Sequence, residues 1–199
     1  MGGISSEFCT TGFSDRITSM NVIHTALPGC LVIEPQIFPD ERGFFFESYN
    51  EKKMAGIGIE YKFVQDNHSY SRKNVLHGLH YQITQPQGKL IRVVVGEVFD
   101  VVVDLRRRSS SFGQWVGVRL SSGNKSMLWV PPGFAHGFVV LSEEAALLYK
   151  TTDFYAAKHE RTILWNDPEL KIDWPVAVPP IISDKDRAGL RFHEAEKFA

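Results

Sequence analysis

The chain has 199 residues and nearly balanced charge, with 22 basic and 23 acidic side chains. That length fits a single domain that is large enough to bury a core. The balance of charge provides no overall field toward nucleic acid or an anionic membrane, so neither is expected as a partner. No apolar run approaches the roughly 20 residues that a membrane-spanning helix requires.

Residues 1–19 contain Ser, Thr and Gly without periodicity and lack the apolar centre of a signal peptide. We expect them to be a disordered leader or a vector-derived segment, with Met20 as the natural start. A single domain is then expected over residues 20–199. The two cysteines, Cys9 and Cys30, have no partner pattern, which favours a reducing compartment, the cytoplasm.

A short helix is the first element that the sequence predicts. Asn50 is a suitable N-cap, residues 51–55 favour a helix, and Gly56 is a suitable stop. Farther along, short runs of β-branched and aromatic residues follow one another, with turn residues between them. These runs are 91–95, 98–103, 115–120, 127–130, 138–141 and 146–149.

The turn between the first two runs, Gly96-Glu97, predicts a two-residue β-hairpin. No helical pattern separates the later runs, which argues against βαβ units. The prolines within residues 168–180 preclude long regular elements in the last part of the chain. The sequence therefore predicts an all-β fold, an antiparallel sandwich or barrel with a few short helices.

Titratable side chains gather just before the most β-rich run, residues 90–105. They are His77, His80, Tyr81 and Lys89. Because histidine titrates near neutral pH and an ammonium group stabilises an anion, this cluster is typical of acid–base chemistry. A histidine that is simply hydrogen-bonded in the core is the alternative on these residues alone.

Residues 131–138 fit the second half of the cupin signature, in which a Pro-x-Gly turn directs His136 into a barrel. In metal-binding cupins, a His-x-His pair and a nearby Glu complete the metal site. Here His77 and His80 are three residues apart, which would place them on opposite faces of a strand. No carboxylate follows them until Glu97. We therefore expect a cupin-type jelly-roll barrel that binds no metal.

Taken together, these stretches resemble the dTDP-4-dehydrorhamnose 3,5-epimerases over about residues 20–187. The stretches that carry the resemblance are 40–47, 65–69, 78–82, 87–89, 131–138, 148–150, 163–167 and 183–186. The resemblance implies an isomerase of dTDP-rhamnose biosynthesis that uses no cofactor. Such an enzyme inverts C3 and C5 of dTDP-4-dehydro-6-deoxy-D-glucose through an enolate and gives dTDP-4-dehydro-L-rhamnose.

The resemblance also implies catalytic roles for particular residues. His80 would be the base, Asp186 would hold its ring, and Tyr149 would be the acid on the opposite face of the sugar. Lys89 would stabilise the oxygen of the enolate. A tyrosine suits the acid because its ordinary pKa is about 10, which makes it a donor rather than a base at neutral pH.

Substrate binding would involve a second set of residues, and in related enzymes some of these contacts come from a second subunit. The resemblance therefore implies a homodimer that binds a dTDP-linked 4-keto-6-deoxyhexose. The residues expected to bind the substrate are Arg42, Glu47, Gln65, Asn67, His77, His136 and Tyr155.

The chain departs from the family pattern at two places. His77 stands where the family usually has an arginine that contacts the diphosphate, and residues 83–86 form a loop that is a residue shorter than usual. These departures leave the proton-transfer residues intact. The alternatives are an epimerase that inverts C3 or C5 alone, a metal-dependent cupin enzyme, and a non-catalytic protein that binds sugar nucleotides.

Overall fold

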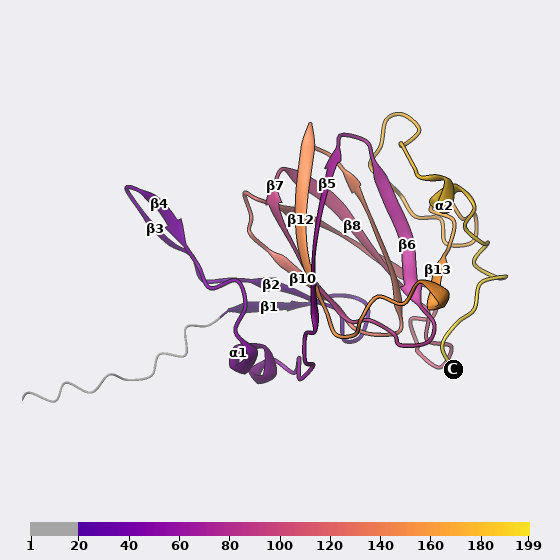
Figure 1. Ribbon diagram of the computed structural model, residues 1–199, viewed down its shortest axis with the longest axis horizontal. Helices are drawn as coiled ribbons and strands as arrows, with labels where there is room; N and C mark the ends of the chain where they lie inside the picture. Colours follow the sequence, from indigo (N-terminus) through magenta and orange to yellow (C-terminus); the bar gives the residue numbers. More distant parts are fainter. Residues whose placement is uncertain (1–19) are drawn as a thin grey trace, which may run out of the picture.

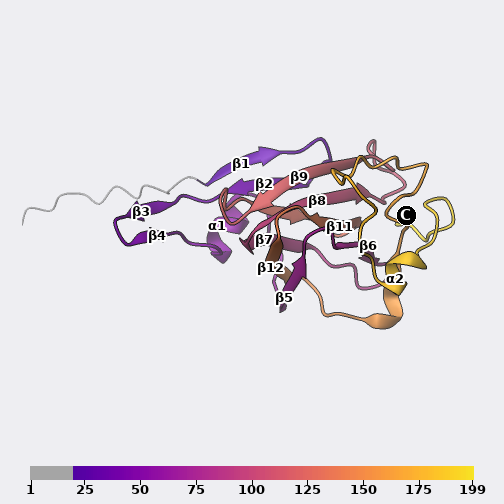
Figure 2. The same ribbon diagram turned by 90° about the horizontal axis from the view of Figure 1, so that it is seen from above.

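The computed structural model describes residues 20–199, so the leader that we expect over residues 1–19 lies outside the described residues. Within residues 20–199 the chain forms a six-stranded sheet, a five-stranded sheet and a separate two-stranded arm (Figures 1 and 2). Every named strand pair is antiparallel. The prediction of a mostly antiparallel β fold is therefore confirmed.

The six-stranded sheet supplies one wall of a sandwich. In spatial order its strands are β1 (Asn21–His24), β2 (Leu31–Glu34), β10 (Met127–Val130), β7 (Lys89–Val95), β12 (Glu144–Thr151) and β5 (Gln65–Arg72). The five-stranded sheet supplies the other wall. Its strands are β13 (Glu160–Thr162), β6 (Leu76–Gln82), β11 (Phe134–Val140), β8 (Glu97–Asp104) and β9 (Trp115–Ser121).

The main core lies between these two sheets. Ile91 and Leu147 contribute to it from the six-stranded sheet, and Val98, Val102 and Val140 contribute from the five-stranded sheet. All of these side chains are at most 1% exposed. Alternate residues of a strand point to opposite faces of its sheet. Polar residues on the inward faces of the two sheets therefore line a cavity between the sheets.

The hairpin predicted at Gly96-Glu97 is wrong. β7 pairs with β10 and β12, whereas β8 pairs with β11 and β9, so the chain crosses from one sheet to the other at Gly96. Gly96 has a φ of +73°, and a Cβ atom there would lie 1.9 Å from the carbonyl oxygen of Glu144. A turn signal marks a change of direction but does not identify the pairing partner. The sheets also alternate at the β9–β10 and β11–β12 turns, as in a jelly roll.

The short helix is confirmed as α1 (Glu51–Gly56). The side chain of Asn50 caps it by accepting a hydrogen bond from the backbone N–H of Lys53 at 3.2 Å. The other helical turns are η1 (Ala157–His159) and α2 (Asp184–Arg187). None of the helices among residues 20–199 is long and apolar enough to cross a membrane.

The C-terminal segment covers the outer face of the five-stranded sheet. Trp174, Leu170 and Phe192 pack in a second cluster with Val101 and Val103 of β8. This packing brings α2 against β6 (Figure 1). The long irregular segment therefore delivers residues of α2 to the edge of the sandwich.

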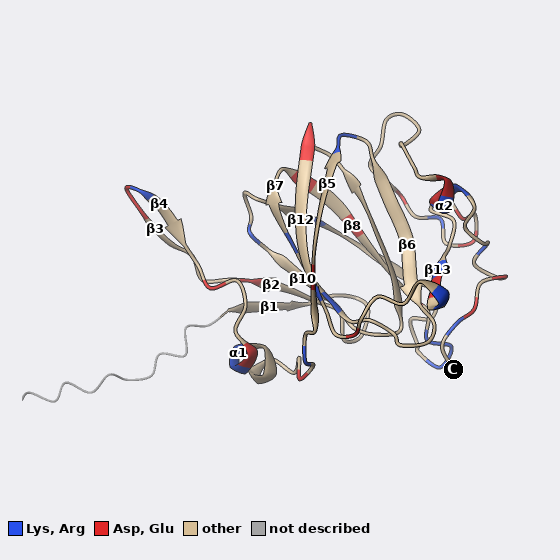
Figure 3. Cartoon of the chain, viewed as in Figure 1, with Lys and Arg blue, Asp and Glu red and all other residues tan. Residues whose placement is uncertain are grey.

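The two-stranded arm, β3 (Phe38–Asp40) and β4 (Gly43–Phe45), extends away from the sandwich (Figure 1). Its aromatic side chains are exposed, at 60% for Phe44 and 68% for Phe45. Charged residues of both signs occur at its tip, on α1 and along the C-terminal segment, whereas most residues of the strands are uncharged (Figure 3).

Candidate active site

A cavity between the two sheets brings together most of the titratable residues that the sequence singled out. Its lining includes His77 and His80 of β6, Lys89 of β7, His136 of β11 and Tyr149 of β12. β6 and β11 belong to the five-stranded sheet, whereas β7 and β12 belong to the six-stranded sheet. The imidazole of His80 and the phenol of Tyr149 are therefore presented from opposite walls.

His80 forms a close hydrogen bond through Nε2 to Oδ1 of Asp186, which lies 106 residues away on α2. Asp186 is 1% exposed, and its backbone N–H donates to the hydroxyl of Ser183 at the start of the helix. Burial alone would raise the pKa of Asp186, but the hydrogen bond and charge of His80 hold it below its ordinary value. The carboxylate thus fixes one nitrogen of the imidazole and stabilises the ring when it is protonated.

Tyr149 and Lys89 lie on the opposite wall, and burial acts on them in opposite ways. It raises the pKa of Tyr149, with a further contribution from Glu160, so the phenol keeps its proton at neutral pH. Burial lowers the pKa of Lys89 to about 8, against the attraction of Asp100 and Glu160. The cavity therefore contains a neutral proton donor and an ammonium group whose charge is lost just above neutral pH.

The expectation that His77 and His80 face opposite sides of a strand is wrong, since both line the cavity. His80 pairs with His136 and His77 pairs with Phe138, so two residues of β6 lie opposite the single residue Gly137. The extra residue of this bulge shifts the inward–outward alternation of the β6 side chains by one position, so that His77 and His80 point to the same face. Gly78, within the bulge, has a φ of +112°, and a Cβ atom there would meet Cα of Gly137 at 2.6 Å.

Asp100 is a site residue that the sequence reasoning missed. Nε2 of His136 lies 2.8 Å from Oδ1 and 3.0 Å from Oδ2 of this carboxylate. Asp100 is 0% exposed and lies on β8 between the inward-facing residues Val98 and Val102. Because a buried carboxylate requires a donor, His136 presents an N–H to it. A lone Asp at an inward position of a Val-rich strand is the signal that could have identified it.

The inward face of β5 is polar, and it carries two of the predicted binding residues. Gln65 donates to Asn67 at 2.9 Å, and the backbone N–H of Tyr155 donates to Gln65 at 3.0 Å. Ser69 lines the cavity, and its hydroxyl is buried without a hydrogen-bond partner among the described residues. Ser71 completes this face by bonding to His77 at 2.8 Å.

Tyr155 is joined to α2 through two residues that were not predicted. Its hydroxyl donates to Glu160 at 2.9 Å, and the same carboxylate accepts a hydrogen bond from Lys185 at 2.6 Å. Burial would raise the pKa of Glu160, but Lys185 and Tyr155 hold it below its ordinary value. The Tyr155 loop is thereby fixed to the helix that carries Asp186.

Arg42 and Glu47 do not reach the cavity of their own chain. Arg42 lies at the tip of the arm, bonds to Asp40 at 2.6 Å and has a side chain that is 84% exposed. Glu47 forms an ion pair with Lys53 of α1 at 3.1 Å. Figure 1 shows the arm on the far side of β2 from α2.

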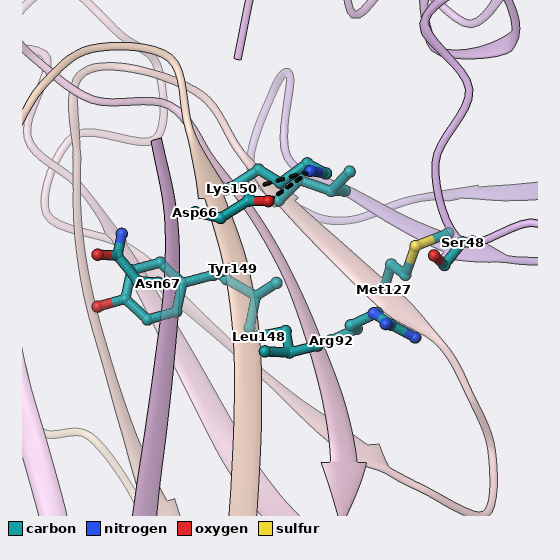
Figure 4. Close-up of a pocket in the computed structure, with 10 residues that line it drawn as sticks. Ser48, Asp66, Asn67, Arg92, Met127, Leu148, Tyr149 and Lys150 are labelled. Carbon is teal, nitrogen blue, oxygen red and sulfur yellow. Dashed lines mark hydrogen bonds and ion pairs between the residues drawn. The ribbon is translucent and has the colours of Figure 1, made fainter. Parts of the chain in front are cut away.

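A second hollow lies on the outer face of the six-stranded sheet. Ser48, Arg92, Met127 and Leu148 line it, with the ion pair between Lys150 and Asp66 at 2.9 Å. Figure 4 shows Tyr149 and Asn67 extending to the opposite side from Lys150 and Met127. Ile91 and Tyr149 border both this hollow and the cavity that contains His80.

No group of three or more His, Cys, Asp or Glu side chains within residues 20–199 is arranged to hold a metal ion. The histidines with carboxylate partners in the cavity each use a different carboxylate. His80 bonds to Asp186, and His136 bonds to Asp100. The two carboxylates therefore each orient a different imidazole.

The family model described as dTDP-4-dehydrorhamnose 3,5-epimerase matches residues 24–194 of the chain. The chain belongs to this family. The dTDP-4-dehydrorhamnose 3,5-epimerase of Pseudomonas aeruginosa is 60% identical over 180 residues, which cover 90% of this chain and 99% of that protein. The family assignment made from the sequence is thereby confirmed.

Solved structures of other family members have the same fold. A Legionella pneumophila epimerase in complex with dTDP-4-keto-L-rhamnose has a TM-score of 0.87 and 51% identity, covering 89% of this chain and 95% of that one. A Bacillus anthracis dTDP-4-dehydrorhamnose 3,5-epimerase with TDP and PPi bound has a TM-score of 0.84 and 47% identity, covering 87% and 99%. The prediction of a cupin-type jelly roll agrees with these structures.

We expect Asp100→Asn to lower the epimerase turnover number by roughly 10- to 100-fold, because a neutral amide replaces the carboxylate that accepts the hydrogen bond of His136 and fixes its ring in the cavity. The matched control is Asp104→Asn, on the same strand and equally buried, whose carboxylate instead bonds to Arg106 and Ser111. That variant should melt at a lower temperature and keep its turnover number. Steady-state kinetics and thermal melts of both variants provide the measurement, and equal turnover in the two would contradict the role of Asp100.

Proposed function

We propose that the chain inverts C3 and C5 of dTDP-4-dehydro-6-deoxy-D-glucose to give dTDP-4-dehydro-L-rhamnose. The observation that carries this proposal is the presence of a carboxylate-bound imidazole and a neutral phenol on opposite walls of one cavity. Inversion of a carbon requires a base on one face of the sugar and an acid on the other. The 60% identity to a 3,5-epimerase along nearly the whole chain favours the two-centre reaction over inversion of one carbon.

The ketone at C4 makes this chemistry accessible, because it acidifies the hydrogens on C3 and C5. His80 removes the proton from one of these carbons, and the electron pair of the C–H bond moves into an enolate. Asp186 stabilises the imidazolium that forms. Tyr149 then donates its proton to the same carbon from the other face, and the C4 ketone is restored.

Lys89 stabilises the enolate oxygen during these steps. Within residues 20–199, its ammonium has no hydrogen bond or ion pair to another residue, although burial disfavours its charge. An anionic oxygen in the cavity would supply the missing partner and favour the protonated lysine. His136, held by Asp100, is the second group that we assign to this part of the cavity.

The nucleotide portion of a dTDP-sugar would contact Gln65, Asn67, His77 and Tyr155. Gln65 and Tyr155 are already connected by a hydrogen bond, and the ring of Tyr155 is 55% exposed and available for stacking on a base. The family members solved with dTDP-4-keto-L-rhamnose or with TDP support this class of ligand.

Arg42 and Glu47 would act on the cavity of a second copy of the chain, so we propose a homodimer. The arm extends beyond the sandwich and exposes Phe44 and Phe45, which a partner could cover. The guanidinium of Arg42 suits a phosphate because it offers paired donors in one plane.

The base is tested by proton NMR of dTDP-4-dehydro-6-deoxyglucose in deuterated water. We expect the wild type to exchange the C3 and C5 protons for deuterium, and His80→Ala to exchange neither while still binding dTDP. His68→Ala is the matched control, because this histidine lies on β5 and is exposed. Full exchange by His80→Ala would remove His80 from the role of base. Exchange at one carbon in the wild type would indicate a single-centre epimerase.

The charge of Lys89 predicts that epimerase activity is lost at alkaline pH. Its amine is protonated below a pKa of about 8 and neutral above it, so kcat/KM should fall as the pH rises through 8. Lys89→Arg keeps its charge across this range. We expect this variant to be slower at every pH but to show no decline near pH 8. A decline at the same pH in both proteins would assign the limit to another group.

The homodimer is tested by light scattering of the purified protein. The wild type should have twice the mass of one chain, whereas replacement of Phe44 and Phe45 by Ser should favour single chains, because it removes the apolar contact of the arm. We expect the double variant to bind dTDP more weakly, since Arg42 no longer reaches a partner. A monomeric wild type would contradict the proposal.

A further inference from the structure

His77 differs from the other two histidines of the cavity in its hydrogen-bond partner. His80 and His136 bond to the carboxylates of Asp186 and Asp100, whereas Nε2 of His77 lies 2.8 Å from the hydroxyl of Ser71. The ring of His77 also packs on Phe138, with centroids 4.8 Å apart. His77 is therefore held in place by contacts that do not supply a negative charge.

A hydroxyl partner accepts both protonation states of an imidazole. When the ring is neutral at Nε2, the Ser71 hydroxyl donates to it. When the ring is protonated there, Nε2–H donates to the Ser71 oxygen. The change requires only rotation of the hydroxyl hydrogen, so the heavy atoms keep their positions. A carboxylate partner, which only accepts when it is ionised, would instead stabilise the protonated form of the ring more than the neutral form.

The surroundings of His77 disfavour its charge when the cavity holds no anion. Burial is the largest effect and lowers the pKa of His77. Of the charged groups that act on it, Asp186 of α2 raises the pKa, whereas His80 of β6, His136 of β11 and Lys185 of α2 lower it. β5 contributes the uncharged Ser71, and β7 contributes Lys89 to the same cavity lining. The free protein should therefore hold His77 mostly neutral at neutral pH.

An anionic ligand beside His77 would instead favour the protonated form of its ring. A sugar nucleotide carries a diphosphate, and the Bacillus anthracis family member was solved with TDP and PPi bound. We propose that His77 takes up a proton when a dTDP-sugar binds, so that the Ser71–His77 pair makes recognition of the diphosphate dependent on pH. This inference rests on the proposed function, because it places the diphosphate beside His77. Affinity should rise as the pH falls, since protons and ligand bind together.

The experiment is isothermal titration calorimetry with dTDP-glucose at pH 7.0, in two buffers that differ in their enthalpy of ionisation. The difference in apparent enthalpy gives the number of protons taken up on binding. dTDP-glucose is preferred to dTDP because its diphosphate is bonded at both ends and has no terminal phosphate that titrates near neutral pH. At pH 7.0, Lys89 is already mostly protonated.

We expect the wild type to take up substantially more protons than His77→Gln, with a difference that approaches one proton per site. The matched control is His68→Gln, which should take up as many protons as the wild type. His77→Arg is charged at every pH and should bind without this uptake, with an affinity that changes less between pH 6 and pH 7.5.

Equal proton uptake by the wild type and His77→Gln would overturn the assignment of His77. Failure of the wild type to bind dTDP-glucose at all would overturn the proposed function as well. Binding without a difference in proton uptake would overturn only the role of His77. NMR of wild-type protein with isotopically labelled histidine provides a second test that does not depend on a folded variant. The His77 ring signals should move to the protonated position when dTDP-glucose is added, and unchanged signals would contradict the proposal.

Discussion

The pairing of partly buried imidazoles with fully buried carboxylates is the constraint on which the rest of the site depends. An isolated carboxylate inside a sandwich is costly, and an unpaired imidazolium is costly for the same reason. Asp186 and Asp100 are at most 1% exposed, and each bonds to a histidine that also lines the cavity. Each pair therefore places a polarised imidazole at the cavity wall without leaving a buried charge alone.

The two sheets divide the chemistry between them. The five-stranded sheet contributes the histidines, and its outer face receives the C-terminal segment that brings Asp186 to His80. The six-stranded sheet contributes Tyr149 and Lys89. In the proposed reaction, a sugar ring between these walls would have a base on one face and an acid on the other. The sandwich architecture thus provides the two-sided arrangement that the proposed inversion requires.

The same burial has different consequences for neighbouring groups. It keeps Tyr149 protonated, brings the pKa of Lys89 to about 8 and lowers the pKa of His77. Lys89 and His77 are thus cavity groups whose positive charge burial disfavours, and both stand to gain from an anion. An enolate oxygen and a diphosphate are the anions that the proposed reaction supplies. On this proposal, the cavity would respond to its ligand through protonation as well as through shape.

The sequence by itself determined the local features of this protein. Asn50 and Gly56 defined a helix and the β-branched runs located the strands β7 to β12, because these signals lie within a few neighbouring residues. The order of the motifs along the chain defined the family. Only the tertiary structure decided which strands pair. Gly96 marks a turn whether the strands on either side of it pair with each other or belong to different sheets. It also decided that the β6 bulge aligns His77 with His80, that Asp100 meets His136, and that Arg42 lies away from its own cavity. Each of these depends on contacts between distant parts of the chain, which no local pattern encodes.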